Sequence, residues 1–318
     1  MPVFGTTVSL RGAMRLSTVF AAAILLSACA STEGRGATDR EDRAPKGTST
    51  QLVVLGTGTP NPDPERMGSG LAIVAGGQPY LIDCGAGVVR RAAEAALPMT
   101  RLTRLFITHL HSDHTLGYAD VILTPWVLER EHPLEVFGPR GTQAMTDNLL
   151  AAYSADIDNR LHGSQPQNAT GIEVDVHEIV PGEVYTDENV TVTAFAVPHG
   201  AWNHAFGYRF DAADRSIVVS GDTVATEAVV AACDGCDVLV HEVYAKWGLD
   251  RRTQNWRAYH KASHTSGVEL GLIAAEARPR LLVLYHQLLW GATEEQLISE
   301  IRQNFDGEIA FANDLDIY

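Results

Sequence analysis

Three histidines and one aspartate, His109, His111, Asp113 and His114, directly follow the apolar run Leu105-Phe106-Ile107. The apolar run predicts a buried strand. Because side chains alternate across a strand, His109 and His111 are expected to point to the same side, and the turn after them carries Asp113 and His114 round the strand end. Imidazole and carboxylate groups at this density predict a metal site that can hold two ions, with a polar, histidine-rich loop as the alternative.

The N-terminal region has the pattern of an export signal. Residues 1–28 carry Arg11 and Arg15 but no acidic residue, and they include an apolar stretch at 19–26 that is short for a membrane span. Leu26-Ser27-Ala28-Cys29 resembles the lipobox of bacterial lipoproteins. We therefore expect residues 1–28 to be a signal peptide and Cys29 to be lipidated, which would anchor an exported protein to a membrane, periplasmic or on the outer face. An ordinary cleaved signal is the alternative.

The rest of the chain divides into a tether and one domain. Residues 29–50 are polar and charged with hardly an apolar residue, so we expect a disordered linker. Residues 51–318 mix strands and helices in both halves, which favours an α/β domain of two packed sheets with helices outside. Strands are expected at 51–55, 71–74, 80–82, 105–107, 134–137, 172–179, 190–197, 206–210, 216–219, 238–240 and 281–284. Helices are expected at 88–96, 118–129, 142–153, after 221, at 267–277 and near the C-terminus, before a final strand, and 154–170 is expected to be irregular.

Charge and cysteine content limit the partners. The formal net charge is −15, so the surface should repel polyanions, and no local basic patch is evident for RNA or DNA. We therefore expect nucleic acid not to be a partner. Cys233 and Cys236 stand alone as a C-x-x-C pair, which favours a local disulfide in an oxidising compartment over free thiols or a zinc site. The sequence leaves the oligomeric state open.

Three later strands end in further candidate ligands. His199 follows Val197-Pro198, Asp222 follows Ser220-Gly221, and His286 follows Leu284-Tyr285. One such residue would more simply be a hydrogen-bonded surface group. In this order behind H-x-H-x-D-H, the three complete the ligands for a two-metal site.

With these motifs, residues 51–318 resemble the metallo-β-lactamase superfamily. The resemblance implies a four-layer αββα sandwich with two Zn²⁺ ions, although ligand type alone does not exclude iron or manganese. It also implies that His109, His111 and His199 bind the first zinc, that Asp113, His114 and His286 bind the second, and that Asp222 bridges both. Asp83, in Ile82-Asp83-Cys84-Gly85, matches a motif that shapes the site without binding metal.

Two further motifs resemble the ribonuclease Z branch of that superfamily. Leu239-Val240-His241-Glu242 follows a strand, and Ser263-His264-Thr265 opens a helix. The resemblance implies that His264 helps the leaving group and that Glu242 orients His264. A histidine with a pKa near 6.5 beside a carboxylate is a plausible proton donor. We therefore expect Asp113, His264 and Glu242 to be catalytic. The alternative is that His264 only neighbours a helix cap and has no role in catalysis.

The chain also departs from transfer-RNA-processing enzymes. It lacks a long Gly/Pro-rich arm, carries Gln287-Leu288-Leu289-Trp290 after His286, and is acidic with an export signal. The stretches 137–141, 148–157 and 241–243 resemble exported arylsulfatases of the same superfamily. The leading hypothesis is therefore a zinc-dependent hydrolase that cleaves a small anionic ester, a sulfate or phosphodiester, by a metal-bridging hydroxide.

Aromatic side chains near the motifs could line a pocket for an aryl group. Trp202 and His204, just after His199, are the preferred substrate contacts. The other candidates are Trp126, Tyr153, Tyr244, Trp247, Trp256 and Trp290. Three alternative functions remain: a ribonuclease Z-like phosphodiesterase on RNA or nucleotides, a lactonase or β-lactamase, and a non-catalytic zinc-binding lipoprotein.

Overall fold

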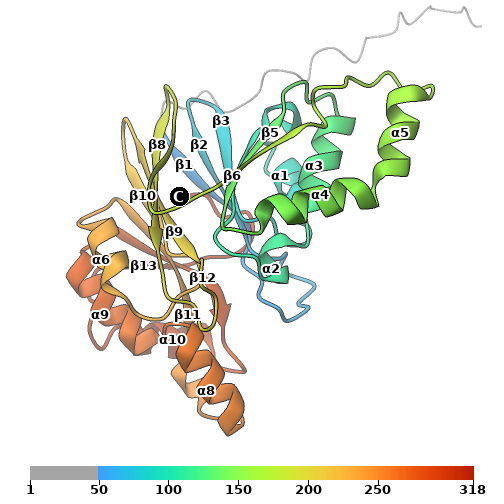
Figure 1. Ribbon diagram of the computed structural model, residues 1–318. Coiled ribbons are helices and arrows are strands. Elements are labelled where there is room, and N and C mark those ends of the chain that lie inside the picture. The colour runs from blue at the N-terminus through green and yellow to red at the C-terminus, as the bar shows by residue number, and fades with distance from the viewer. Residues whose placement is uncertain (1–48) are drawn as a thin grey trace, which may run out of the picture. The chain divides into compact units, whose positions relative to one another are not determined.

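Two β-sheets pack face to face between layers of helices in the computed structural model, which describes residues 49–318 (Figure 1). The first sheet has six strands, which lie in chain order from β1 to β6. Its strands are β1 (Gln51–Gly56), β2 (Gly70–Ala75), β3 (Gln78–Ile82), β4 (Arg104–Phe106), β5 (Leu134–Gly138) and β6 (Val174–Glu178). The strands from β3 onward are parallel.

The second sheet has seven strands in reverse chain order, from β13 to β7. They are β7 (Gly182–Thr186), β8 (Val190–Ala196), β9 (Phe206–Ala212), β10 (Ser216–Val219), β11 (Val238–Tyr244), β12 (Leu281–Leu288) and β13 (Glu308–Phe311). The four strands β10 to β13 are parallel, so their carboxyl ends lie at one edge of the sheet.

The alternation of apolar side chains explains the layers. In β1, Leu52 and Val54 pack into the core between the sheets, whereas Val53 and Leu55 pack on the opposite face. Each sheet is therefore apolar on both faces, and its outer face must be covered by helices. Three large apolar cores result, one between the sheets and one under each helical layer, and a small fourth cluster is formed by Tyr244, Leu249 and Leu288.

Helices cover the outer faces of both sheets (Figure 1). The connections between the strands of the first sheet contain α1 (Val88–Glu94), α2 (Ser112–Thr115), α3 (Tyr118–Val127), α4 (Thr142–Ala152) and α5 (Ser154–His162), with a 3₁₀ turn at Met99–Arg101. The second sheet carries α6 (Glu227–Cys233), α7 (Lys246–Leu249), α8 (Gln254–Ser263), α9 (Gly267–Ala277) and α10 (Glu294–Ile301). Helix α8 extends away from the sheets at the lower end of the view.

The expected αββα sandwich is confirmed, and the differences are local. Strand β7 was not expected, and its half-exposed, polar sequence explains why, since it is the last strand of its sheet. Helix α5 occupies part of the stretch that was expected to be irregular, and none of its side chains is buried. Helix α8 was also missed, because its exposed faces carry polar and aromatic residues rather than an apolar stripe.

The remaining predictions concern the cysteine pair and the N-terminal region. Cys233 and Cys236 form a disulfide, as their spacing favoured. The expected signal peptide, the lipidated Cys29 and the linker up to residue 48 lie outside the described residues. Thr50, at the expected end of the linker, is buried and donates hydrogen bonds from its N–H and hydroxyl to Asp214. Between residues 49 and 318, no helix combines the length and apolarity needed to span a bilayer.

Candidate metal centre

The predicted ligands come from separate strand ends and meet at one edge of the sandwich. His109, His111, Asp113 and His114 follow β4, and His199 follows β8. Asp222 follows β10, after Gly221 at a φ of 61°. A Cβ at Gly221 would lie 2.5 Å from the backbone oxygen of Phe206, so a side chain there is excluded both by the backbone conformation and by space.

A β-bulge places His286 in the cluster. The pairing of β11 with β12 shifts by one residue, from Glu242 opposite Tyr285 to Val243 opposite Gln287, so His286 is the extra residue. Its φ of 47° lies in the left-handed region. Bulges of this kind redirect a side chain from the regular alternation of the strand. The pattern of β12 alone therefore does not predict the direction of this imidazole.

The first group of ligands brings three imidazoles together. His109 Nε2 lies 2.9 Å from His111 Nδ1, and His199 Nε2 lies 3.1 Å from the same nitrogen. His199 Nδ1 donates a hydrogen bond to the backbone oxygen of Ser263 at 2.7 Å. That bond fixes the tautomer, so His199 Nε2 presents a lone pair to the cluster.

The second group brings Asp113, His114 and His286 together. Asp113 Oδ2 lies 3.1 Å from His286 Nε2 and 3.6 Å from His114 Nε2. The outer nitrogen of His114, Nδ1, lies 2.7 Å from Asp83 Oδ2. His114 Nε2 is buried and has no hydrogen-bond partner among residues 49–318. The ring is thus held by Asp83 with an unpaired nitrogen facing the cluster.

Asp222 lies between the two groups. Its Oδ2 is 4.0 Å from His109 Nε2, 3.5 Å from His114 Nε2 and 3.6 Å from His286 Nε2. Burial by itself would raise the pKa of this carboxyl, but the neighbouring His286 and His114 imidazoles outweigh burial and hold the pKa well below its usual value. Asp222 is therefore an anion near neutral pH.

The donor set fits two divalent cations. His109, His111, His199 and Asp222 hold their donor atoms within 4.8 Å of one another, as do Asp113, His114 and His286. Burial lowers the pKa of His109, His111 and His199, in the case of His111 to about 4, so these rings are neutral, as metal binding requires. Burial alone would also lower the pKa of His114 and His286, but Asp222 and the neighbouring carboxylates outweigh burial and raise the pKa of both rings. A bound cation would take the place of the proton on each of these two rings.

His264 and Glu242 form a buried pair beside the cluster. His264 Nδ1 lies 3.2 Å from Glu242 Oε1, which also accepts hydrogen bonds from the backbone N–H groups of Thr223 and Thr265. His264 Nδ1 is also 3.9 Å from Asp222 Oδ2. Since Oε1 is an acceptor for three groups, His264 donates from Nδ1 and its Nε2 is left for the cavity.

The pKa of His264 differs from the expectation. Burial, aided by the nearby His286, lowers it to about 4, although Asp222 acts in the opposite direction. Burial, followed by the charge of Asp222, raises the pKa of Glu242 well above its usual range. The expected pKa near 6.5 for His264 is therefore wrong for the free protein, because the ring is 6% exposed.

A cavity of about 640 Å³ opens over the cluster. Its walls include the predicted residues His111, Asp113, Asp222, His264 and His286. They also include side chains from and around α8 that were not singled out, Arg252, Asn255, Tyr259 and His260, together with Trp256 and Trp290. Tyr259 and His260 follow Trp256 at helical spacing, which is the signal that could have found them.

The two preferred substrate contacts lie apart. The indole N–H of Trp202 donates to His111 Nε2 at 2.6 Å, so Trp202 touches the cluster. His204 instead lines a separate cavity of about 310 Å³ with Arg140 and Glu178. The chain turns between His199 and Trp202, at Gly200 with a φ of 54°, and a bridge pairs His199 with Trp202. Trp126 is buried in the core under the first sheet.

Comparison with known proteins supports one family. Residues 79–287 match the family described as "Beta-lactamase superfamily domain". Ribonuclease Z of Mycobacterium marinum is 33% identical over 83% of this chain and 96% of its own length. Ribonuclease Z of Mycobacterium sp. (strain KMS) is 35% identical over 75% of this chain and 84% of its own length.

Solved structures share the fold. The metallo-beta-lactamase fold protein YhfI from Bacillus subtilis superposes with a TM-score of 0.65 at 19% identity, over 85% of this chain and 99% of YhfI. The short form of human tRNase Z superposes with a TM-score of 0.63 at 24% identity, over 84% of this chain and 98% of the human protein.

These relatives correct two expectations. The leading hypothesis of an arylsulfatase-type hydrolase of a small anionic ester is wrong, because similarity over most of the chain is to proteins named ribonuclease Z. The expectation that nucleic acid is not a partner is wrong for the same reason. Net charge averaged over the whole chain does not show where basic side chains gather. On its fold, its sequence and its matched domain, the chain belongs to the metallo-β-lactamase superfamily.

Proposed function

We propose that the protein is a metal-dependent, ribonuclease Z-like phosphodiesterase that hydrolyses RNA. The observation that carries this proposal is the similarity to ribonuclease Z over 83% of the chain, in a protein that places the His264–Glu242 pair beside two clusters of metal-ligand side chains. The ester bond in RNA is a phosphodiester, and its cleavage needs a nucleophile, charge neutralisation and a proton for the leaving oxygen.

The predicted ligands form two groups, each of which would hold one cation. His109, His111 and His199 would hold one, Asp113, His114 and His286 the other, and Asp222 lies between them. Bound cations would supply Lewis acidity toward the phosphate oxygens and lower the pKa of a water molecule. Asp83 and the backbone oxygen of Ser263 would keep His114 and His199 in the required tautomers.

His264 would deliver the proton that the leaving oxygen needs. Its Nδ1–H is directed to Glu242, so Nε2 is the atom available to a substrate in the cavity. A phosphodiester carries a negative charge, and an anion placed beside the ring raises its pKa from the low value of the free protein. His264 would then accept a proton at Nε2 and deliver it to the leaving oxygen, while Glu242 fixes the ring's orientation.

The test compares RNA with a small phosphodiester on the same protein. Zinc-loaded protein is incubated with a precursor transfer RNA and, separately, with bis-p-nitrophenyl phosphate. We expect both to be cleaved, and a chelator to abolish both activities. His264→Ala should slow RNA cleavage about 10²-fold or more but affect the nitrophenyl ester less, because nitrophenolate leaves without a proton. His162→Ala, an exposed histidine on α5, serves as the control. Hydrolysis of the nitrophenyl ester without RNA cleavage would overturn the proposal.

The cellular location is proposed from the N-terminal sequence alone. We propose that residues 1–28 direct export and that Cys29 is the lipidated mature N-terminus. Mass spectrometry of the mature protein should find a lipid on Cys29, and Cys29→Ser should move the protein from the membrane fraction to the soluble fraction. An unmodified N-terminus at Met1 would contradict export.

A further inference from the structure

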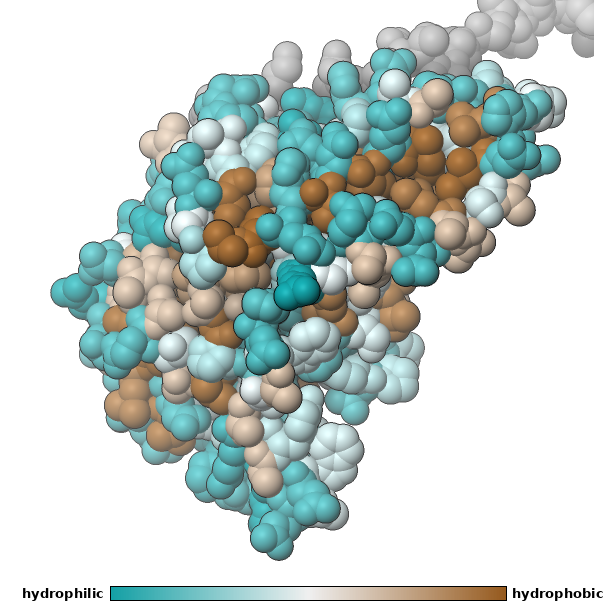
Figure 2. Space-filling model, viewed as in Figure 1, coloured by the Kyte–Doolittle hydropathy of each residue, from teal (hydrophilic) through white to brown (hydrophobic). Residues whose placement is uncertain are grey.

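The segment from α7 to α8, residues 246–261, is basic in an acidic protein. It carries five basic residues and one acidic residue, whereas the whole chain has a net charge of −15. The basic residues are Lys246, Arg251, Arg252, Arg257 and Lys261. Most of the segment's side chains are exposed, and the end of the molecule formed by α8 is hydrophilic or pale rather than apolar in Figure 2. The segment is therefore a local cationic surface.

Aromatic rings are interleaved with these cations. The side chains of Trp256 and Tyr259 on α8 are 47% and 44% exposed, which is unusual for such large apolar rings. The guanidinium carbon of Arg252 lies 5.6 Å from the centre of the Trp256 ring. In the same segment, the guanidinium carbon of Arg251 lies 3.2 Å from the centre of the Trp247 ring. Flat faces and positive charge are thus presented together to solvent.

The surface leads directly to the metal centre. The Trp256 ring stacks on His260, with centroids 5.5 Å apart and an interplanar angle of 21°, and the His260 ring lies 5.4 Å from that of His264. Arg252, Trp256, Tyr259 and His260 all line the cavity over the cluster. The His260 side chain is 7% exposed, and its Nδ1 has no hydrogen-bond partner among the described residues. A buried, unpaired nitrogen on a cavity wall indicates a ligand that would satisfy it.

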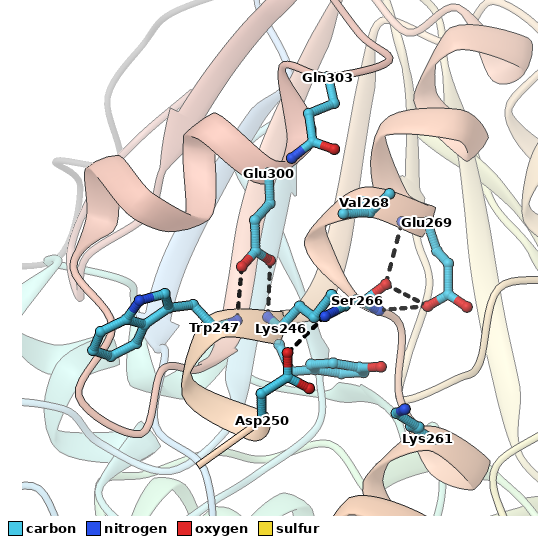
Figure 3. A pocket seen from close by; sticks show the side chains of 10 residues that line it. Lys246, Trp247, Asp250, Lys261, Ser266, Val268, Glu269, Glu300 and Gln303 are labelled. Atoms are coloured by element: carbon cyan, nitrogen blue, oxygen red, sulfur yellow. Dashed lines mark hydrogen bonds and ion pairs between the residues drawn. The ribbon is translucent and has the colours of Figure 1, made fainter.

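The body of the protein holds α7 in place. The backbone N–H groups of Lys246 and Trp247 donate to the two carboxylate oxygens of Glu300, each at 2.8 Å (Figure 3). The acidic residue of the segment, Asp250, pairs with Lys246 Nζ at 2.6 Å. The cavity in Figure 3 is also lined by Glu269 and Glu300 and is a poor site for a polyanion. Lys261 lines this same cavity, whereas Arg252 lines the cavity over the metal centre and Arg257 lies on α8.

We infer that residues 246–261 bind an unpaired stretch of RNA beside the scissile bond, with bases stacked on Trp256 and Tyr259 and phosphates paired with Arg252 and Arg257. This inference rests on the proposed function for the identity of the nucleic acid. Bases can stack on aromatic side chains only where they are not stacked within a duplex. Guanidinium groups pair with phosphates through planar, bidentate contacts. The surface therefore selects single-stranded RNA over duplex RNA.

The test measures binding separately from cleavage. A fluorescently labelled single-stranded RNA of twelve nucleotides is titrated by anisotropy against the zinc-loaded protein and, in parallel, against chelator-treated protein. The same sequence as a blunt duplex is titrated alongside. We expect the single strand to bind more tightly than the duplex, and Trp256→Ala and Tyr259→Ala each to weaken single-strand binding about tenfold, a typical loss for one base stack. Arg252→Gln should also weaken it.

Two variants serve as matched controls. Tyr153→Ala removes a tyrosine that is 43% exposed, close to the 44% of Tyr259. Although its sequence made it a candidate for the substrate pocket, Tyr153 lies between α4 and α5 and does not line the cavity over the cluster. Arg90→Gln removes an exposed arginine on α1. Neither should change binding. Absence of single-strand binding, equal affinity for the duplex, or equal losses in Tyr153→Ala and Tyr259→Ala would overturn the inference.

The outcomes separate this inference from the proposed function. If the single strand binds as expected and no RNA is cleaved, the binding surface stands and the ribonuclease activity fails. If RNA is cleaved while Trp256→Ala and Tyr259→Ala bind and cleave as wild type, the activity stands and the binding surface fails.

Discussion

At the scale of single residues, Asp83 contacts the outer nitrogen of the predicted metal ligand His114. Its carboxylate lies 2.7 Å from His114 Nδ1 and also accepts hydrogen bonds from the N–H and hydroxyl of Thr108. Asp83→Asn keeps an acceptor for Thr108 but turns an amide N–H toward His114, which favours the wrong tautomer. We expect zinc affinity to fall about 10- to 100-fold with little change in folding. Competition with a coloured chelator measures the affinity, and an unchanged value would show that Asp83 does not act through His114.

The sequence predicted which side chains meet, but it did not predict which atoms they present. The ligand types and their positions after strands could be predicted from H-x-H-x-D-H and from His199, Asp222 and His286. The tautomers could not, because they depend on hydrogen bonds between residues far apart in the chain, such as that from His199 Nδ1 to the Ser263 oxygen. The direction of His286 depends on a β-bulge, which the pattern of β12 does not indicate.

Trp202 gives a second prediction, which is measured by tryptophan fluorescence and needs no activity assay. His111 Nε2 accepts a hydrogen bond from the Trp202 indole, which places the ring proton on Nδ1. A cation at Nδ1 would displace that proton to Nε2 and break the indole contact. Zinc should therefore shift tryptophan emission to longer wavelength as the Trp202 ring becomes more exposed, and Trp202→Phe should abolish the shift. A shift that persists in this variant would assign the signal to another of the five tryptophans.

His260 gives a prediction on pH and stability. Burial lowers its pKa to about 4, whereas histidine in an unfolded chain titrates near 6.5. Between these values the unfolded chain binds more protons, so stability is complete above pH 6.5 and falls as the pH drops toward 4. Over this pH window, the free energy of unfolding of His260→Gln should fall by about 1 to 2 kcal/mol less than that of wild type. Urea unfolding at pH 7 and pH 4.5 measures the difference, and parallel losses would contradict it.

At the scale of helices and strands, periodicity predicted the elements that bury an apolar face. Strands such as β1 send alternate side chains into two cores, and this pattern is visible in the sequence. Helix α5 packs only Ile157 and Leu161 against the core, both partly buried, and the buried residues of α8 are the polar His260 and Ser263. A method based on apolar patterns does not find helices with so narrow an apolar face.

The disulfide gives a prediction at this scale. Cys233–Cys236 ties the end of α6 to the turn before β11, and both side chains are buried. A closed loop this short constrains the unfolded chain modestly, so Cys233→Ala with Cys236→Ala should lower the free energy of unfolding by about 2 kcal/mol. Cys84→Ala, which removes a buried free cysteine, measures the cost of losing sulfur packing alone. Equal losses in the two variants would mean that the cross-link itself contributes nothing.

At the scale of the whole molecule, the net charge of the chain was a poor guide to its partners, because binding depends on where the charges lie. A net charge of −15 describes the average surface, whereas RNA bound as we propose would meet only the groups beside the cavity. Apart from the pair Arg251-Arg252, the cations of residues 246–261 are separated by aromatic and polar residues, so they form no long run in the sequence. The cavity brings Arg252, Trp256 and Tyr259 to the predicted metal ligands. This proximity arises from strand order and packing, which local sequence does not specify.

The contrast between a local cationic surface and an acidic whole leads to a prediction on salt. Each phosphate neutralised on single-stranded RNA contributes about −0.7 to the slope of log K against log salt concentration. The inference assigns two phosphate contacts, to Arg252 and Arg257, whereas Lys246 is engaged by Asp250. Two contacts predict a slope of about −1.4, and Arg252→Gln should reduce its magnitude by about 0.7. Arg90→Gln should leave the slope unchanged, because that side chain lies on α1. A slope near zero, or one that responds equally to both substitutions, would mean that RNA is held elsewhere on the protein.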